Sequence, residues 1–462
     1  MVYVGTRDGM LHAFDAGTFR HGDNPGTAFK ENRGYFEWHD KTGDCPAYCG
    51  GKREECPDYG TGEELWAFIP PNLISRLKNN LRHTNDLAAV DASPALADVY
   101  LDGQWKTVLL SAEGRGGEAV FCLDVTDPFN PEFMWEFADP DLFRSRSLPS
   151  VARIGRIADE GETKWVAFFA SGKADDASGY PSMFMIDIAD GSLVRRISLD
   201  TDPRGIGGLP NAQPAVVDSD GNGYLDRVYI GSDRGYLYKI NIPDDPGNGY
   251  DDVSQCVING DFTDDDLNEI PTAQQYQPVY GSPVAVVANR LNADGRLSYR
   301  IRLFFGTGGS PNHHEDADLR NARYHLFAYR DEDEKGRCNQ GRVHLEWFYE
   351  LPAGEHMAAS AFAAAENIYF GTRAVHTASR GNGGDSSGKS RGGGIYALSM
   401  EGKPVMAKDI GNITTPPLVV DEHLYTKTQS GGLQSFGKGP YNNLAKTGTT
   451  PEFKLRSWRE FF

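Results

Sequence analysis

The side chains best placed to do chemistry in this sequence belong to one short segment, residues 218–226. Oxygen-bearing side chains stand at its first, third, fifth and ninth positions, and Gly223 stands at the sixth. The candidate ligands are Asp218, Asp220, Asn222, Tyr224 (through its backbone carbonyl) and Asp226. Ca²⁺ takes roughly six to eight oxygen ligands, which alternate residues of a tight turn can supply. Glycine permits the left-handed backbone that such a turn needs. The spacing predicts a calcium loop, and a solvated turn between two strands is the alternative that these residue types leave open.

Two other motifs have the residues of a binding site without the surroundings that the chemistry needs. Residues 383–390 match the pattern of a phosphate-binding loop, but strand-like sequence follows where that loop needs a helix N-terminus. His313 and His314 are adjacent, and adjacent residues in an extended chain seldom converge on one metal ion. We therefore expect neither segment to bind a ligand.

The six cysteines leave more than one kind of chemistry open. Cys45, Cys49 and Cys56 lie close together in one polar segment. A local disulfide is the simplest interpretation for a secreted protein, and free thiols or a zinc site completed by His39 are the alternatives. The residues around Cys122 are apolar, which indicates a buried thiol in the core.

The composition limits the classes of partner and of fold. The formal net charge of −19 over 462 residues argues against nucleic acid, because no basic patch offsets it. No apolar run approaches the length of a membrane-spanning helix. The 53 glycines and the many tyrosines and phenylalanines, without long helix-period segments, favour short strands joined by turns. The sequence therefore predicts an all-β fold.

One phrase recurs along the chain: an apolar strand that often ends in glycine and threonine or serine, a turn, and a second strand. Its seven copies begin at Val2, Val108, Val166, Val228, Leu303, Ile368 and Leu424. A second phrase, a small residue followed by proline and a short apolar run, precedes most copies, as in Ser93–Leu96. Regular repetition of this kind indicates a propeller, in which radial closure protects the sheet edges. We predict a seven-bladed β-propeller with modified, quinoprotein-like blades, and a β-sandwich is the alternative.

The repeat also predicts the domain organisation. We expect one propeller domain over residues 1–462, interrupted by three segments of different composition. Residues 20–60 form a cysteine-bearing insertion in the first blade, residues 241–278 an acidic insertion, and residues 377–394 a loop rich in glycine and serine. The predicted calcium loop joins two strands of a single blade.

The chain resembles the propeller domain of the PilC/PilY family of type IV pilus biogenesis factors and tip adhesins. The segments that carry the resemblance are Met1–Ala16, Glu64–Pro70, Val90–Leu96, Gly116–Pro128 and Ser457–Glu460. They span nearly the whole chain, and the five candidate ligands match the calcium loop of the family position by position. Residues 20–60 interrupt a stretch that is continuous in the family, so the resemblance implies no role for them.

The resemblance implies regulation rather than catalysis. It implies a Ca²⁺-dependent protein that controls pilus extension against retraction, and with it twitching motility and cell adhesion. It implies partners among the minor pilins at the pilus tip, and a host or abiotic surface. It further implies a secreted, pilus-associated protein at the cell surface, the outer membrane or the periplasm.

A quinoprotein-like dehydrogenase is the rival interpretation, because such propellers share phrases such as Phe14–Ala16 and Thr61–Trp66. These phrases are packing devices between blades and do not confer activity. The adjacent cysteines found in one branch of those enzymes are absent. We therefore predict that the chain is not an enzyme.

Overall fold

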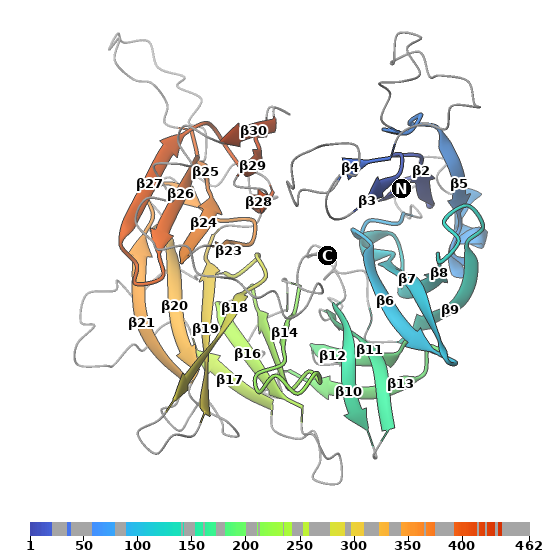
Figure 1. Ribbon diagram of the computed structural model, residues 1–462, viewed down its shortest axis with the longest axis horizontal. Coiled ribbons are helices and arrows are strands. Elements are labelled where there is room, and N and C mark those ends of the chain that lie inside the picture. Colours follow the sequence, from blue (N-terminus) through green and yellow to red (C-terminus); the bar gives the residue numbers. More distant parts are fainter. Residues whose placement is uncertain are drawn as a thin grey trace. The chain divides into compact units, whose positions relative to one another are not determined.

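Antiparallel sheets make up the described part of the chain, as Figure 1 shows for the computed structural model. The described residues are 1–20, 35–37, 58–78, 89–139, 142, 153–159, 162–171, 181–199, 210, 213–233, 235–242, 253–257, 278–291, 297–308, 323–331, 343–364, 366–374, 392–413, 415–420, 423–429 and 433–436. They divide between two compact units, Met1–Ala138 and Asp139–Phe462. No helix in these residues has the length and apolar character needed to span a bilayer. The all-β prediction is confirmed.

Where the structure describes the first unit, it forms one three-stranded sheet, one four-stranded sheet and one short strand pair. The three-stranded sheet is β1 (Val2–Gly5), β2 (Leu11–Phe14) and β5 (Glu64–Phe68). The four-stranded sheet is β6 (Ala95–Leu101), β7 (Gln104–Ala112), β8 (Ala119–Asp124) and β9 (Glu132–Ala138). The pair is β3 (Phe19–Arg20) and β4 (Tyr35–Phe36), and the 3₁₀ turns are η3 (Pro71–Arg76) and η4 (Gly114–Gly116).

The described residues of the second unit form five sheets of three or four strands and one strand pair. The first two sheets are β10 (Arg153–Asp159), β11 (Glu162–Ser171), β12 (Ser182–Asp187) and β13 (Leu193–Ser198), then β14 (Ala215–Val217), β15 (Arg227–Gly231), β16 (Tyr236–Asn241) and β17 (Val253–Val257). The third is β18 (Val284–Leu291), β19 (Leu297–Gly306), β20 (His325–Asp331) and β21 (Val343–Glu350). The last two are β23 (Phe362–Ala364), β24 (Asn367–Gly371), β26 (Gly394–Ser399) and β27 (Pro404–Asp409), then β28 (Leu418–Val420), β29 (His423–Lys427) and β30 (Leu433–Phe436). The pair is β22 (Glu355–His356) and β25 (Arg373–Ala374).

The sheets of the second unit pack face to face in chain order. One apolar cluster joins the β10–β13 sheet to the β14–β17 sheet, and further clusters join each sheet to the next as far as β28–β30. The first strands of consecutive sheets also approach one another, β14 beside β18, β18 beside β23 and β23 beside β28. This arrangement is typical of propeller blades. The seven-blade count and the single domain over 1–462 stay predictions.

The glycine of the recurring phrase has a packing role at the junction between sheets. At Gly5, Gly231, Gly306 and Gly371 an added Cβ would lie within 3.0 Å of the segment that leads into the next sheet. The residue after each glycine accepts a backbone hydrogen bond from that segment, as in Ile413 N–H to the Thr372 carbonyl at 2.9 Å. At these four junctions the strand therefore has to pass without a side chain at the point of closest approach.

Tryptophan side chains make a second link between consecutive sheets. Trp66 on β5 donates its indole Nε1–H to the carbonyl of Pro128 in the β8–β9 turn at 2.8 Å. Trp347 on β21 donates in the same way to the carbonyl of Met400 in the β26–β27 turn at 2.8 Å. The two bonds place the last strand of one sheet against a turn of the following sheet.

A buried ion pair joins the β14–β17 and β18–β21 sheets. Lys239 Nζ on β16 lies 2.7 Å from Asp331 Oδ2 on β20, and the two side chains are 0% and 1% exposed. Tyr229 on β15 donates its hydroxyl hydrogen to the same Asp331 oxygen at 2.7 Å. The charged groups are therefore paired with each other in an apolar interface.

The predicted insertions are only partly described. Within residues 241–278, β17 pairs with β16 as the fourth strand of its sheet, so most of the described part of this segment belongs to a sheet. Within residues 20–60, β4 pairs with β3. Most of residues 377–394 lies outside the described residues.

Candidate calcium site

The predicted loop connects β14 to β15. The strands pair antiparallel with Val217 opposite Arg227, and the Asp226 N–H donates to the Val217 carbonyl at 2.9 Å. Both glycines of the loop adopt left-handed backbone, with φ of 77° at Gly221 and 90° at Gly223. The sequence pattern predicts this conformation at Gly223 and does not identify it at Gly221. The loop is therefore a compact turn within one sheet.

Asp218 organises the first half of the loop. Its Oδ1 accepts the backbone N–H groups of Gly221 at 2.7 Å and Asn222 at 3.2 Å, and its Oδ2 accepts that of Gly223 at 2.7 Å. Successive amide groups that point at one carboxylate form a nest, which favours a negative charge. The loop backbone thus wraps around the first candidate ligand.

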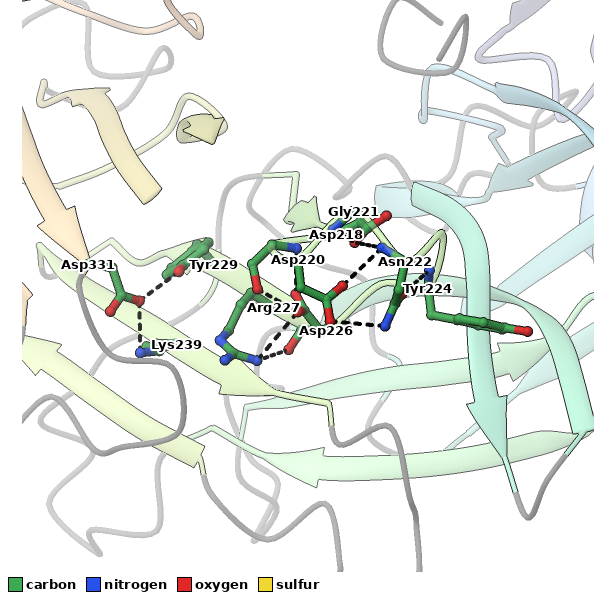
Figure 2. A network of polar contacts seen from close by, with 11 residues as sticks. Asp218, Asp220, Gly221, Asn222, Tyr224, Asp226, Arg227, Tyr229, Lys239 and Asp331 are labelled. Atoms are coloured by element: carbon green, nitrogen blue, oxygen red, sulfur yellow. Dashed lines mark hydrogen bonds and ion pairs between the residues drawn. The ribbon is translucent and has the colours of Figure 1, made fainter. Parts of the chain in front are cut away.

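Asp220 and Asn222 lie beside Asp218, as Figure 2 shows. Asp220 accepts the backbone N–H of Asn222 at 3.0 Å and its side-chain amide at 3.1 Å. The side-chain oxygen of Asn222 accepts the backbone N–H of Tyr224 at 2.8 Å. Three of the four candidate oxygen side chains are therefore assembled on one side of the turn by local bonds.

Asp226 has a structural role in addition to its predicted one. It is 6% exposed, and its oxygens accept the backbone N–H of Ser219 at 3.0 Å and the Ser219 hydroxyl at 2.5 Å. Arg227 Nη1 donates to the Asp226 carbonyl at 2.7 Å and lies 3.9 Å from Oδ2 of that carboxylate. Asp226 therefore closes the end of the loop against its start.

Asp218 and Asp226 have raised pKa values in spite of the groups that donate to them, so their charged forms are disfavoured on balance. Burial raises the pKa of Asp218 above its usual value, and the neighbouring Asp220 raises it further. Burial also raises the pKa of Asp226, against the opposing effects of Ser219 and Arg227. By contrast, hydrogen bonds from Ser192 lower the pKa of Asp190 in the β12–β13 turn. Among the described residues, no neighbouring carboxylate raises the pKa of Asp190 there. Burial and proximity of like charges distinguish the loop from an ordinary acidic turn.

The donor set fits a hard cation in its chemistry. All five candidate ligands present oxygen, three of them as carboxylates, which suits Ca²⁺ and not a thiol- or imidazole-seeking metal. In the part of the chain that the structure describes, no group of three or more His, Cys, Asp or Glu side chains is arranged to hold a metal ion. The carboxylates point at amide N–H groups and at Ser219 instead. Binding through this loop would exchange some of these bonds for metal contacts.

The side chain of Tyr224 points away from the other candidate ligands, toward the strands of the preceding sheet (Figure 2). Its hydroxyl lies 2.9 Å from Thr163 Oγ1 on β11, and the Arg156 guanidinium lies 5.6 Å from the centre of its ring. The sequence pattern does not identify Thr163 or Arg156, because they precede the loop by about sixty residues and belong to no motif.

The structure does not test the remaining candidate motifs. Residues 383–390, His313, His314 and the cysteines at 45, 49 and 56 lie outside the described residues. Cys122 is buried with a free thiol, as its apolar surroundings predict.

Three comparisons with known proteins each match this chain to PilY1. The family model described as the PilY1 beta-propeller domain matches residues 78–345. The type IV pilus biogenesis factor PilY1 of Pseudomonas aeruginosa strain PAO1 is 28% identical over 250 residues, which are 52% of this chain and 17% of that protein. A PilY1 homolog of Xylella fastidiosa is 26% identical over 322 residues, which are 68% of this chain and 20% of that protein. The chain thus matches only a small part of the length of these relatives.

A solved structure supports the fold. The crystal structure of the Pseudomonas aeruginosa PilY1 C-terminal domain superposes with a TM-score of 0.56 and 17% sequence identity. The match covers 94% of this chain and 90% of that one. At this identity the likeness concerns the fold alone, and it agrees with the face-to-face sheets described above.

Proposed function

The chain belongs to the PilY1 β-propeller domain family, and on that premise we propose that it is the calcium-binding propeller of a type IV pilus biogenesis and tip-adhesin protein. In this role it regulates pilus extension against retraction and contributes to surface attachment. The relatives support the pilus association, because they are named type IV pilus biogenesis factors.

The observation that carries the calcium part is the loop between β14 and β15. Asp218, Asp220 and Asn222 already lie together there, and the half-buried Asp218 and the buried Asp226 have raised pKa values that a nearby cation would lower. Asp218, Asp220, Asn222, the Tyr224 carbonyl and Asp226 would hold the ion. When bound, Ca²⁺ supplies two positive charges that offset the carboxylate repulsion and fix the turn.

Calcium can regulate the protein if the surface that a partner recognises differs between the calcium-free and the calcium-bound loop. A ligand shifts an equilibrium only by its differential affinity for the states involved. In this proposal calcium favours one arrangement at the edge of the β14–β17 sheet, and pilus components recognise that arrangement. The partners are minor pilins at the pilus tip and a host or abiotic surface, which places the protein outside the cell or in the periplasm.

We propose no catalytic role. The relatives are named as biogenesis factors, and the phrases shared with dehydrogenase propellers have packing roles here: Trp66, in one of them, donates to Pro128 of the next sheet. The dehydrogenase alternative therefore has no observation in its favour.

Calorimetric titration with Ca²⁺ tests the site. Asp220→Ala is the best variant, because Asp220 bonds only locally to Asn222, whereas the buried Asp226 also holds Ser219 in place. Asp190→Ala is the matched control, since Asp190 accepts a similar N–H bond in another turn. We expect one saturable site, weakened at least about tenfold by Asp220→Ala and unchanged by Asp190→Ala, because affinity follows ligand charge.

Absence of binding by the folded protein, or equal binding by the two variants, would reduce the loop to a turn. The pilus part is tested separately. In a piliated host the full-length protein with Asp220→Ala should alter twitching motility when calcium is varied, and Asp190→Ala should not. Identical motility of the two variants would refute calcium control.

A further inference from the structure

The second half of the calcium loop lies against the preceding sheet rather than its own. The Leu225 N–H donates to the Arg156 carbonyl on β10 at 2.8 Å. The Leu225 side chain packs on the apolar cluster between the two sheets, over Gly155, where an added Cβ would lie within 3.0 Å of it. Backbone and side-chain contacts thus join residue 225 to β10.

Arg156 fills the space between the loop and β11. Its guanidinium lies 5.6 Å from the centre of the Tyr224 ring and 5.8 Å from that of the Trp165 ring. It also lies against Gly223, where an added Cβ would be 2.6 Å from Nη2. A planar cation between two aromatic rings is held by the ring quadrupoles and by stacking. The position of the guanidinium therefore depends on residues of both sheets.

These contacts fix the residue whose carbonyl is a candidate ligand. Tyr224 is held through its ring by Arg156 and through its hydroxyl by Thr163 at 2.9 Å. Its backbone is consequently held from the preceding sheet as well as by Asn222, whereas Asp218 and Asp220 are held from within the loop. The candidate site is thus complete only when β10 and β11 are in contact with the loop.

We propose that Arg156 is a positioning residue for the calcium loop, and that it couples calcium binding to the contact between the β10–β13 and β14–β17 sheets. This inference rests on the calcium site proposed above. Arg156 cannot be a ligand, because a guanidinium has no acceptor. It acts through Tyr224 and Gly223, and binding of the ion in turn strengthens the packing of the loop on β10.

Because Arg156 is charged, the direction in which its replacement changes the calcium affinity tests the proposal. A positive charge beside the loop repels Ca²⁺, so its removal would tighten binding if electrostatics alone mattered. Loss of positioning acts in the opposite direction. We expect Arg156→Met to weaken calcium binding about fivefold or more, although the variant has one positive charge fewer. Arg195→Met, which removes a charge from β13 of the same sheet, is the control and should leave the affinity unchanged.

Tyr224→Phe is a milder second variant, in case Arg156→Met fails to fold. It removes the bond to Thr163 and keeps the ring, and we expect calcium affinity to fall about threefold. Calorimetry gives the affinity, and thermal unfolding with and without Ca²⁺ gives the coupling. The rise in Tm that calcium produces should shrink in both variants.

The outcomes separate this inference from the calcium site itself. If the unmodified protein does not bind Ca²⁺, the site fails and the inference fails with it. If the protein binds and Arg156→Met binds equally well or more tightly, the site stands and the positioning role is refuted. A merely structural role would lower the Tm of Arg156→Met equally with and without calcium and leave its affinity unchanged, which also overturns the proposal.

Discussion

Replacement of Lys239 by methionine should destabilise the protein strongly. The Lys239 ammonium and the Asp331 carboxylate are 2.7 Å apart and nearly inaccessible to solvent. In Lys239→Met the Asp331 carboxylate would lose the ammonium and keep the hydrogen bond from the Tyr229 hydroxyl, which stays a neutral donor because burial raises the pKa of Tyr229. Removal of one member of a buried pair leaves an uncompensated charge, which costs roughly 3–5 kcal/mol. We expect the free energy of unfolding to fall by that amount.

Urea denaturation measures the effect, with Lys239→Met/Asp331→Leu as the second variant. Replacement of both charges by apolar groups of similar volume is often close to neutral. The double variant should therefore recover part of the lost stability, although the buried Tyr229 hydroxyl loses Asp331 as its acceptor. Lys106→Met is the control, because the Lys106–Asp124 pair is more exposed, at 22% and 12% for its side chains. We expect that control to cost about 0–1 kcal/mol. A loss below about 1 kcal/mol for Lys239→Met, or a double variant no more stable than the single one, would refute the reasoning.

Two further predictions concern the sheet junctions and pH. Gly371→Ala should lower the free energy of unfolding by about 1–3 kcal/mol in denaturant titrations, because its Cβ would overlap Ile413. Adding Ile413→Ala should offset part of this loss. If the losses of the two single variants simply add in the double variant, the overlap is not the cause. Burial raises the pKa of Glu113 from its usual 4.5 to about 7, so the folded state favours the protonated acid. Stability should therefore fall as pH rises from 4.5 through about 7, by up to about 3 kcal/mol. Glu113→Gln should remove this dependence when unfolding is measured at pH 5 and pH 8, and an unchanged slope would assign it to other groups.

The sequence predicted the fold class because its strongest signal is periodic. The apolar runs that begin at Val228 and Ile368 are the second strands of their sheets, β15 and β24. The reason for the glycine that ends each run, close approach of the next sheet, is visible only in three dimensions. β17 was missed because the strand lies among acidic residues, and the composition of residues 241–278 indicated a loop.

In the candidate site, too, the sequence predicted features that are local in the chain and missed contacts between distant residues. The spacing from Asp218 to Asp226 is local, so its position between two strands of one sheet could be predicted. Arg156 could not, because an isolated arginine in a strand carries no signal until the fold places it beside Tyr224. Contacts between sheets are set by packing, and no sequence period encodes them.

The tryptophan at the outer edge of a sheet has a spectroscopic consequence. The Trp347 indole lies half-buried against the β26–β27 turn, with its Nε1–H bonded to the Met400 carbonyl and Gly402 beneath its ring. When two sheets separate, the indole loses this bond and its apolar contacts and enters water, which shifts its emission to longer wavelength. In a variant whose other six tryptophans are replaced, intrinsic fluorescence can therefore report the opening of this one boundary between sheets.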